Sequence, residues 1–257
     1  MAELSYKMDY HLKGEVFVVT GGSRGIGRVV AALLLEQGAN VVICARKQAG
    51  LDAVQDALKG GDRLLTVQAH AAKTEDVDTL FRRTLEKFQR IDGLIHNVGM
   101  NIISTVMDVE EALWHKIIDS NLNAAFLCAR KAGQIMRNQK YGKIVCLSSL
   151  AGTRAAPAMG IYGIAKSAIE MMTRVLAQEL AAFNVQVNAV APGMVRTGFS
   201  EPFWSDERLY DHIVKSIPQG RIAEPIEIAH PILFLCSKGA DFITGQIFRV
   251  DGGASAV

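Results

Sequence analysis

Short apolar runs alternate along this chain with segments whose apolar residues recur at helical spacing. The runs are rich in β-branched residues and predict buried strands, whereas a three- and four-residue repeat predicts helices. We therefore predict an α/β fold in which a doubly wound parallel sheet of about seven strands carries helices on both faces. The predicted strands are residues 16–20, 41–46, 64–68, 93–96, 144–147, 185–190 and 247–250.

Two helical segments have features that can be read from their residues. Thr74 precedes an acidic first turn and is expected to cap the N-terminus of its helix. Residues 113–136 predict one long helix, and the amide of Asn121 interrupts its apolar face. By itself, such an amide is either a solvent-facing or capping residue, or part of a site.

The helix that begins near Tyr162 is apolar on more than one side, which predicts burial on more than one face. One face must meet the sheet, so the other is available to meet a second subunit. We therefore expect a homodimer or homotetramer. One apolar row is Ala165, Ile169, Met172, Leu176 and Leu180, and the other is Ile164, Ala168, Met171 and Val175.

The composition limits the classes of function. A chain of 257 residues, 49% of them hydrophobic, can form one domain, and we predict a loose arm over residues 1–11 and a single domain over residues 12–257. The net charge of +2 argues against nucleic-acid binding. No apolar run reaches the ~20 residues of a membrane span and no signal peptide is evident, so we expect a cytoplasmic protein that does not enter a membrane. The four cysteines lack metal-ligand spacing, so we expect free thiols and no bound metal.

A glycine-rich turn directly follows the first predicted strand and precedes a helix. Glycines let a backbone approach a pyrophosphate closely, and the amino end of a helix favours its negative charge. The spacing is Gly-x3-Gly-x-Gly rather than the commoner Gly-x-Gly-x-x-Gly, and a tight strand-to-helix connection would also explain it. We predict a dinucleotide-binding Rossmann fold whose phosphate-binding residues are Gly21, Ser23, Arg24, Gly25, Ile26 and Gly27.

The end of the second predicted strand, from Cys44 to Lys47, has no carboxylate. An acidic residue there would bond the ribose 2′-hydroxyl of NAD. Arg24 and Arg46 instead offer two guanidiniums, which suit a 2′-phosphate by charge and geometry. We predict that the cofactor is NADP(H). The alternative is that Arg46 is a solvated residue at a strand end.

A hydroxyl, a phenol and an ammonium follow the fifth predicted strand. Ser149 lies at the carboxyl end of that strand, where parallel sheets bind ligands. Tyr162 and Lys166 are four residues apart and share a helix face. A nearby positive charge favours the phenolate, so we expect Lys166 to lower the Tyr162 pKa from its ordinary value of about 10. The phenol could then exchange a proton with a carbonyl or alcohol oxygen that Ser149 holds.

These motifs occur together in an order that resembles the short-chain dehydrogenase/reductase family, over residues 12–253. In two places the chain departs from the family pattern. His70-Ala71 stands where the family usually has Asp-Val, which weakens the expected adenine contact, and His96 and Val98 alter the usual Asn-Asn-Ala-Gly. We interpret His96 as a packed residue rather than a catalytic one. The shared motifs are Thr20 to Gly27, Asn97 with Gly99, Asn121, Ser149, Tyr162 with Lys166, and Pro192-Gly193.

The resemblance implies a role for each matching residue. Ser149 would position the substrate oxygen and Tyr162 would transfer the proton, while Lys166 would also hold the nicotinamide ribose. Asn121 would complete a catalytic tetrad by supporting a water-mediated proton path to Lys166. The remaining cofactor contacts would fall on Asn97 and Gly99 beside the adenosine, and on Pro192, Gly193, Val195 and Thr197 beside the nicotinamide, with Tyr162 and Lys166 between them.

We therefore predict an NADP-dependent oxidoreductase that interconverts a ketone and a secondary alcohol. Residues 198–217 are rich in aromatic and apolar side chains and are interpreted as a substrate lid, so we expect an apolar small-molecule substrate. One alternative is a 3-oxoacyl-[acyl-carrier-protein] reductase with a basic surface for its acidic carrier protein. A non-catalytic dinucleotide-binding scaffold or sensor is the other. The basic residues considered are Arg130, Lys131, Arg137, Lys140 and Lys143, which a solvated surface would explain equally well.

Overall fold

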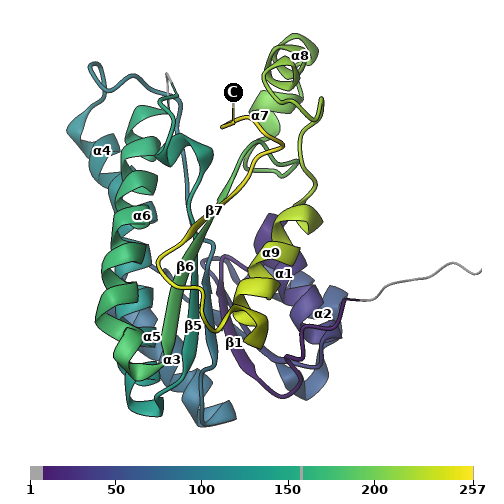
Figure 1. Cartoon of the computed structure of the whole chain (residues 1–257), viewed down its shortest axis with the longest axis vertical. Coiled ribbons are helices and arrows are strands. Elements are labelled where there is room, and N and C mark those ends of the chain that lie inside the picture. Colours follow the sequence, from purple (N-terminus) through teal and green to yellow (C-terminus); the bar gives the residue numbers. More distant parts are fainter. Residues whose placement is uncertain (1–7, 157–158, 257) are drawn as a thin grey trace, which may run out of the picture.

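One parallel sheet organises the chain. The computed structural model describes residues 8–156 and 159–256. Within them, seven strands pair in the order β3-β2-β1-β4-β5-β6-β7, every pair is parallel, and the order reverses between β1 and β4. Figure 1 shows this sheet running through the middle of the molecule, with helices on both sides. The predicted fold class is confirmed. The strands are β1 (Val16–Thr20), β2 (Asn40–Ala45), β3 (Leu64–Gln68), β4 (Gly93–His96), β5 (Gly142–Leu147), β6 (Val185–Pro192) and β7 (Ile247–Val250).

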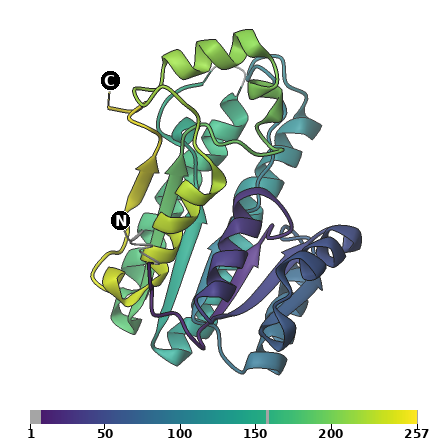
Figure 2. The same ribbon diagram turned by 90° about the vertical axis from the view of Figure 1, so that its right-hand side faces the viewer.

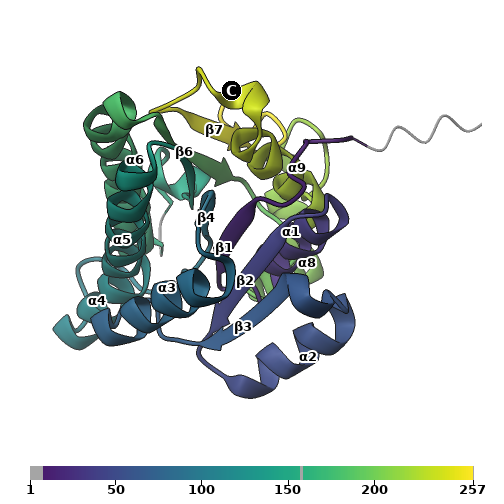
Figure 3. The same cartoon turned by 90° about the horizontal axis from the view of Figure 1, so that it is seen from below.

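Helices cover both faces of the sheet (Figure 3). Successive side chains of a strand point to opposite faces, and β1 divides accordingly. Phe17 and Val19 join one buried apolar cluster, whereas Val18 joins the other. One face carries α1 (Gly25–Glu36), α2 (Gln48–Leu58) and α9 (Pro225–Cys236), and the other carries α3 (Thr74–Phe88), α5 (Ala124–Gln139) and α6 (Gly160–Leu180).

The predicted lid segment, residues 198–217, contains two short helices. They are α7 (Glu201–Trp204) and α8 (Glu207–Lys215), and they lie beyond the carboxyl ends of the strands (Figure 2). The structure therefore has a cover above the edge of the sheet where ligands of parallel sheets bind.

The 3₁₀ turns are Gly61–Arg63, Leu150–Gly152, Ala181–Phe183 and Lys238–Ala240.

The long helix expected over residues 113–136 is not continuous, so that prediction is wrong. A helix α4 (Glu111–Ile118) passes into a π-helical turn (Asp119–Asn123) before α5 begins. Asn121 lies in this turn, and its Nδ2 donates to the carbonyl oxygens of Ile117 and Met100, each at 2.8 Å. The Asn121 amide thus bonds the loop at Met100, 21 residues earlier in the chain, as well as its own helix. Single π turns of this kind often occur at functional sites.

The expected N-cap role of Thr74 is also wrong. Thr74 is the first residue of α3, and Lys73 holds the cap position with an extended backbone and no side-chain cap bond. The carboxylate of Asp76 in the first turn instead accepts a hydrogen bond from the backbone N–H of His70 at 2.7 Å. An acidic residue in the first turn of α3 therefore fixes the position of the segment just before the helix.

The predicted arm, residues 1–11, is only partly described, since residues 1–7 lie outside the described ranges. Tyr10 is buried, and its hydroxyl lies 2.9 Å from Nδ1 of His230 on α9. Its backbone N–H donates to the side chain of Gln37 at 2.7 Å. The described part of the arm is therefore attached to the domain at Tyr10 rather than loose.

The two apolar rows of α6 have different surroundings. Ala165 and Ile169 are fully buried against the sheet, whereas Ile164, Met171 and Val175 are 44%, 57% and 45% exposed. The sheet covers one row only, as the sequence predicted.

No helix within the described residues is long and apolar enough to cross a membrane.

Candidate active site

The glycine turn between β1 and α1 is held closed by Asn97. Gly21 and Gly25 have φ angles of 65° and 54°, a region that side chains disfavour. A Cβ on Gly27 would lie 2.5 Å from the carbonyl oxygen of Gly21 and 2.6 Å from Nδ2 of Asn97. That Nδ2 donates to the same carbonyl at 3.1 Å. The turn is therefore packed so tightly against the end of β4 that only glycine fits at position 27.

A cavity of about 960 Å³ opens at the carboxyl ends of the strands, beneath the lid. It brings together nearly all residues that the sequence assigned to a site. Gly27 and Asn121 are the exceptions, since both lie behind the lining. The assigned residues that line the cavity are Gly21, Ser23, Arg24, Gly25, Ile26, Arg46, Asn97, Gly99, Ser149, Tyr162, Lys166, Pro192, Gly193, Val195 and Thr197.

The formally charged side chains that line this cavity are all cationic. No Asp or Glu is among the described residues of the lining. Such a cavity attracts anions, because nearby positive charges lower the free energy of a negative group bound there. The cations are Arg24, Arg46, Lys47, Arg154 and Lys166.

Tyr162 and Lys166 project from the first turns of α6 into the cavity. Lys166 is 2% exposed, and its Nζ donates to the carbonyl oxygen of Leu147 at 2.7 Å. The same Nζ lies 5.4 Å from the centre of the Tyr162 ring. Burial lowers the pKa of Lys166 to about 8, partly opposed by Cys146. The ammonium of Lys166 is thus fixed beside the phenol of Tyr162, and its burial makes it a stronger acid than an exposed lysine.

The expected lowering of the Tyr162 pKa is not found. Burial raises this pKa to about 12, because a phenolate loses its hydration in an apolar site, and the side chain of Ser149 only partly opposes the rise. The phenol therefore keeps its proton near neutral pH. This state suits a proton donor.

Asn121 lies behind Lys166, on the far side of Gly99. Asn121 is fully buried, and its Oδ1 accepts from the backbone N–H of Met100 at 3.3 Å. A Cβ on Gly99 would lie 2.9 Å from that Oδ1 and 3.3 Å from Nζ of Lys166. The amide and the ammonium thus approach each other over a position that only glycine leaves open.

Ser149 is held by a short turn rather than by a regular element. Its Oγ accepts from the backbone N–H of Ala151 at 3.2 Å, at the start of the Leu150–Gly152 turn. The neighbouring Ser148 donates to the buried carboxylate of Glu170 at 2.8 Å. These bonds fix the segment that presents the Ser149 hydroxyl to the cavity.

The two histidines that depart from the family pattern differ in position. His96 is fully buried outside the cavity lining, with its Nδ1 3.2 Å from the hydroxyl of Thr20. Burial, reinforced by Lys166, lowers its pKa to about 3, so it is neutral and packed. His70 does line the cavity, but its Nδ1 accepts a hydrogen bond from the backbone of Ala72 at 3.2 Å.

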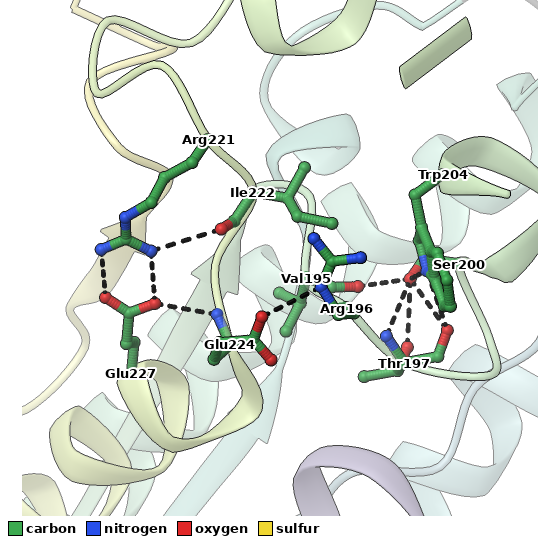
Figure 4. Close-up of polar contacts among 9 residues, drawn as sticks. All are labelled: Val195, Arg196, Thr197, Ser200, Trp204, Arg221, Ile222, Glu224 and Glu227. Atoms are coloured by element: carbon green, nitrogen blue, oxygen red, sulfur yellow. Dashed lines mark hydrogen bonds and ion pairs between the residues drawn. The ribbon is translucent and has the colours of Figure 1, made fainter. Parts of the chain in front are cut away.

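The sequence reasoning missed the network that joins the lid to the loop after β6 (Figure 4). Ser200 and Trp204 of this network bond Val195 and Thr197, which the sequence did single out. A serine three residues after Thr197, just before a helix, was the available signal, since serine in that position often bonds the local backbone. The lid also contacts Tyr162 directly, because the ring of Phe199 lies 5.9 Å from the Tyr162 ring.

Within the described residues no group of His, Cys, Asp and Glu could hold a metal ion. The four cysteines are buried free thiols.

The sheet, its reversal between β1 and β4, and the cavity at that point define the class of doubly wound α/β proteins that bind dinucleotides. A family model described as enoyl-(acyl carrier protein) reductase matches residues 21–255. The chain therefore belongs to the short-chain dehydrogenase/reductase family, a family of oxidoreductases, as its motifs predicted.

Individual relatives agree with this assignment. A 3-oxoacyl-[acyl-carrier-protein] reductase of Synechocystis is 38% identical over 94% of this chain and 97% of its own. The dehydrogenase/reductase SDR family member 4 of Oryctolagus cuniculus is 36% identical over 95% and 94%. A crystal structure described as that of a putative gluconate dehydrogenase from Agrobacterium tumefaciens superimposes with a TM-score of 0.94 at 30% identity, covering 98% of this chain and 100% of that one.

Proposed function

We propose that the protein is an NADP-dependent oxidoreductase that interconverts a ketone and a secondary alcohol. The observation that carries the proposal is the convergence of Ser149, Tyr162 and Lys166 on one cavity that also contains the glycine turn. The buried amide of Asn121 behind Lys166 completes the group.

The residues present fit a nicotinamide dinucleotide. The glycine turn, with positive φ at Gly21 and Gly25, leaves its backbone open to a pyrophosphate at the start of α1. The lining also contains Val195 and Thr197 of the loop after β6, which would hold the carboxamide. When bound, the nicotinamide supplies or accepts the hydride, and the protein supplies orientation and proton transfer.

In the direction of reduction, Tyr162 donates its phenolic proton to the substrate oxygen. Its raised pKa keeps that proton available at neutral pH. The Ser149 hydroxyl donates a hydrogen bond to the same oxygen and holds it near the phenol. Lys166, anchored by the Leu147 carbonyl, stabilises the phenolate that forms and would hold the ribose hydroxyls of the bound nicotinamide cofactor.

The preference for NADP over NAD is supported by the charge of the adenosine end. Arg24 and Arg46 are exposed at the lining, and Ala45 occupies the place where a carboxylate would select the ribose 2′-hydroxyl. Two guanidiniums can form charge-assisted bonds with a 2′-phosphate.

The substrate proposed is an apolar ketone or alcohol. The lid, the turn before α6 and the loop after β6 contribute apolar side chains to the cavity, and the ring of Phe199 in the lid lies 5.9 Å from the ring of Tyr162. A buried apolar wall favours an apolar substrate because it removes the substrate surface from water. The apolar residues concerned are Met159, Met194, Phe199, Phe203, Ile213 and Ile217.

A second candidate is a 3-oxoacyl-[acyl-carrier-protein] reductase, favoured by the name of the Synechocystis relative. The basic surface considered for the carrier is smaller than the sequence suggested. Lys143 is 1% exposed and pairs with Asp241 at 2.5 Å, so it cannot dock a protein, and Lys131 pairs with Asp78. Arg130, Arg137 and Lys140 remain exposed.

A direct assay tests both candidates and the scaffold alternative. NADPH oxidation is followed at 340 nm with a panel of apolar ketones and with a 3-oxoacyl thioester. Turnover of the ketones supports the proposal. A much higher kcat/KM for the thioester would favour the carrier-protein reductase. Cofactor binding without turnover of any carbonyl compound would favour the scaffold.

A further inference from the structure

The hydroxyl of Ser200 lies at the centre of a network between the loop after β6 and the first lid helix (Figure 4). Ser200 is 6% exposed. Its Oγ donates to the carbonyl oxygen of Val195, and accepts from the backbone N–H of Thr197 and from the indole Nε1 of Trp204, each at 3.2 Å. Val195 and Thr197 are the residues proposed to hold the nicotinamide carboxamide. Ser200 thus bonds the loop at the two residues that flank Arg196.

The Ser200 hydroxyl has one proton to donate and two lone pairs to accept with. Its proton goes to the Val195 carbonyl, since the Thr197 carbonyl, 3.2 Å away, is the more distant acceptor. The backbone N–H of Thr197 uses one lone pair, and the other is shared between the Trp204 indole and the Thr197 hydroxyl, which also lies 3.2 Å from Ser200 Oγ. The bonding capacity of Ser200 is therefore used within the loop and the lid.

Trp204 attaches the lid helix α7 to the same loop. Its Nε1 also donates to the carbonyl oxygen of Thr197 at 3.2 Å, and its ring lies 5.1 Å from the guanidinium of Arg196. Phe203 lines the cavity, whereas Trp204 does not. The docking of α7 therefore depends on the loop, without contact between Trp204 and the contents of the cavity.

The other side of the loop is tied to the segment before α9. The backbone N–H of Arg196 donates to Ala223 at 2.8 Å, and that of Ala223 donates to Met194 at 2.9 Å. The Arg196 guanidinium also bonds Glu224 at 3.0 Å, and the backbone N–H of Glu224 bonds Glu227 at 2.8 Å. These contacts with Ala223 and Glu224 do not involve Ser200. Removal of the Ser200 hydroxyl should therefore weaken the contact between the loop and the lid, while the contact with the segment before α9 remains.

We propose that Ser200 is a positioning residue for the nicotinamide end of the cofactor. Its hydroxyl holds Val195 and Thr197 in the binding conformation, and the bond from Trp204 makes the position of α7 respond to that end. The inference rests on the proposed cofactor site and adds a coupling between the cofactor and the lid through the Ser200 hydroxyl and the Trp204 indole.

The first experiment compares two ligands by isothermal titration calorimetry. One is NADPH, and the other is 2′-phospho-ADP-ribose, which is the same molecule without the nicotinamide. Ser200→Ala should weaken the binding of NADPH about ten-fold, a loss expected from one or two hydrogen bonds. The affinity for 2′-phospho-ADP-ribose should not change. The control is Ser237→Ala, since Ser237 is also 6% exposed and donates to a backbone carbonyl, but lies outside the cavity lining. It should weaken neither ligand.

The second experiment observes Trp204 itself. The chain has two tryptophans, so 5-fluorotryptophan labelling gives two ¹⁹F resonances, and Trp204→Phe identifies the one from Trp204. NADP⁺ should shift that resonance, whereas 2′-phospho-ADP-ribose should not. In Ser200→Ala saturated with NADP⁺, the shift should be clearly smaller, because only the direct bond from Trp204 to the Thr197 carbonyl remains.

The outcomes separate this inference from the proposed function. Equal weakening of both ligands in Ser200→Ala would mean a general structural role, and no weakening would mean that Ser200 does not position the loop. A Trp204 resonance that shifts as fully in Ser200→Ala as in wild type would overturn the coupling. In each case the proposed cofactor would stand. A wild-type protein that binds neither ligand would overturn both proposals.

Discussion

At the scale of single residues, the site depends on side chains whose properties are set by burial. Burial raises the pKa of Tyr162, which therefore retains its proton, and lowers the pKa of Lys166, which therefore loses its proton more readily. The sequence was sufficient to bring Ser149, Tyr162 and Lys166 together, because helical spacing and a strand end determine where they lie. It was not sufficient for the direction of the Tyr162 pKa, because two opposing effects act and only the structure gives the extent of burial.

The first residue-scale prediction concerns the proton. Tyr162→Phe should reduce kcat by at least about 10³-fold, within the range measured for the loss of a general acid, because the ring remains and the proton is gone. NADPH affinity, measured by titration of its fluorescence, should change little. Turnover near that of wild type would exclude Tyr162 as the proton donor.

The second residue-scale prediction concerns cofactor choice. The ratio of kcat/KM for NADPH over NADH should be about ten-fold to a thousand-fold in wild type, because charged hydrogen bonds to a 2′-phosphate are strong but partly exposed here. Arg46→Ala should reduce the ratio, and the double variant Ala45→Asp with Arg46→Ala should move it further towards NADH.

Arg28→Ala serves as the control for cofactor choice, since Arg28 is an exposed arginine of α1 outside the cavity lining. It should leave the ratio unchanged. A wild type that prefers NADH, or an Arg46→Ala variant with the wild-type ratio, would contradict the role given to Arg46.

At the scale of elements, periodicity located most strands and helices, and failed where distant contacts decide the local geometry. The strand from Gly142 to Leu147 begins two residues before its predicted start, since Gly142 and Lys143 also pair in the sheet. The π turn around Asn121 could not be read from residues 113–136, because it is accompanied by a bond to Met100 from another part of the fold. Ser200 was missed because its partners meet only when the lid folds over the loop.

The N-terminus of α9 gives an element-scale prediction. Arg221 bonds both carboxylate oxygens of Glu227, at 2.6 and 2.7 Å, and holds the pKa of Glu227 at about 2, below its ordinary value of 4.5 (Figure 4). A depressed carboxylate pKa stabilises the folded state above the unfolded pKa, and this stabilisation is lost as the pH falls towards the folded pKa. Glu227→Gln should therefore lower Tm by about 1–3 °C at pH 7, a modest shift because the pair is half-exposed.

The difference in Tm between wild type and Glu227→Gln should shrink as the pH is lowered from about 4.5 towards 2, as far as both proteins remain folded. Differential scanning calorimetry across this range provides the measurement. A difference that is constant with pH would show that the carboxylate charge contributes nothing to the stability.

At the scale of the whole molecule, one apolar surface has no cover among the residues that the structure describes. It consists of Ile164, Met171 and Val175 of α6 together with Phe126 of α5, which is 48% exposed. An exposed apolar row on two adjacent helices is typical of a surface that associates with another subunit. We propose that two copies of the chain pack through this surface.

The expected result is a dimer or tetramer in sedimentation equilibrium at micromolar concentration. Met171→Asp should shift the protein towards the monomer, because dimerisation would bury an unpaired charge. Met8→Asp is the matched control, since Met8 is 55% exposed and Met171 is 57% exposed, but Met8 lies outside the row. A monomeric wild type, or a Met171→Asp variant with unchanged mass, would contradict the interface.

The central position of β1 has a consequence for the order in which the protein can form. One edge of β1 pairs with β2, which follows soon after it in the chain, but the other edge pairs with β4, which is synthesised much later. The backbone N–H of Val16 likewise donates to the carboxylate of Asp92, which lies 76 positions later. During synthesis the first three strands can assemble as a half-sheet whose open edge is β1 itself, a strand that is fully buried in the finished fold. Long-range parallel pairing is slow, and an exposed apolar edge invites pairing with other chains. The nascent chain is therefore most prone to aggregate in the interval before β4 has emerged, and the pairing of β4 with β1 both ends that interval and creates the reversal at which the cofactor cavity opens.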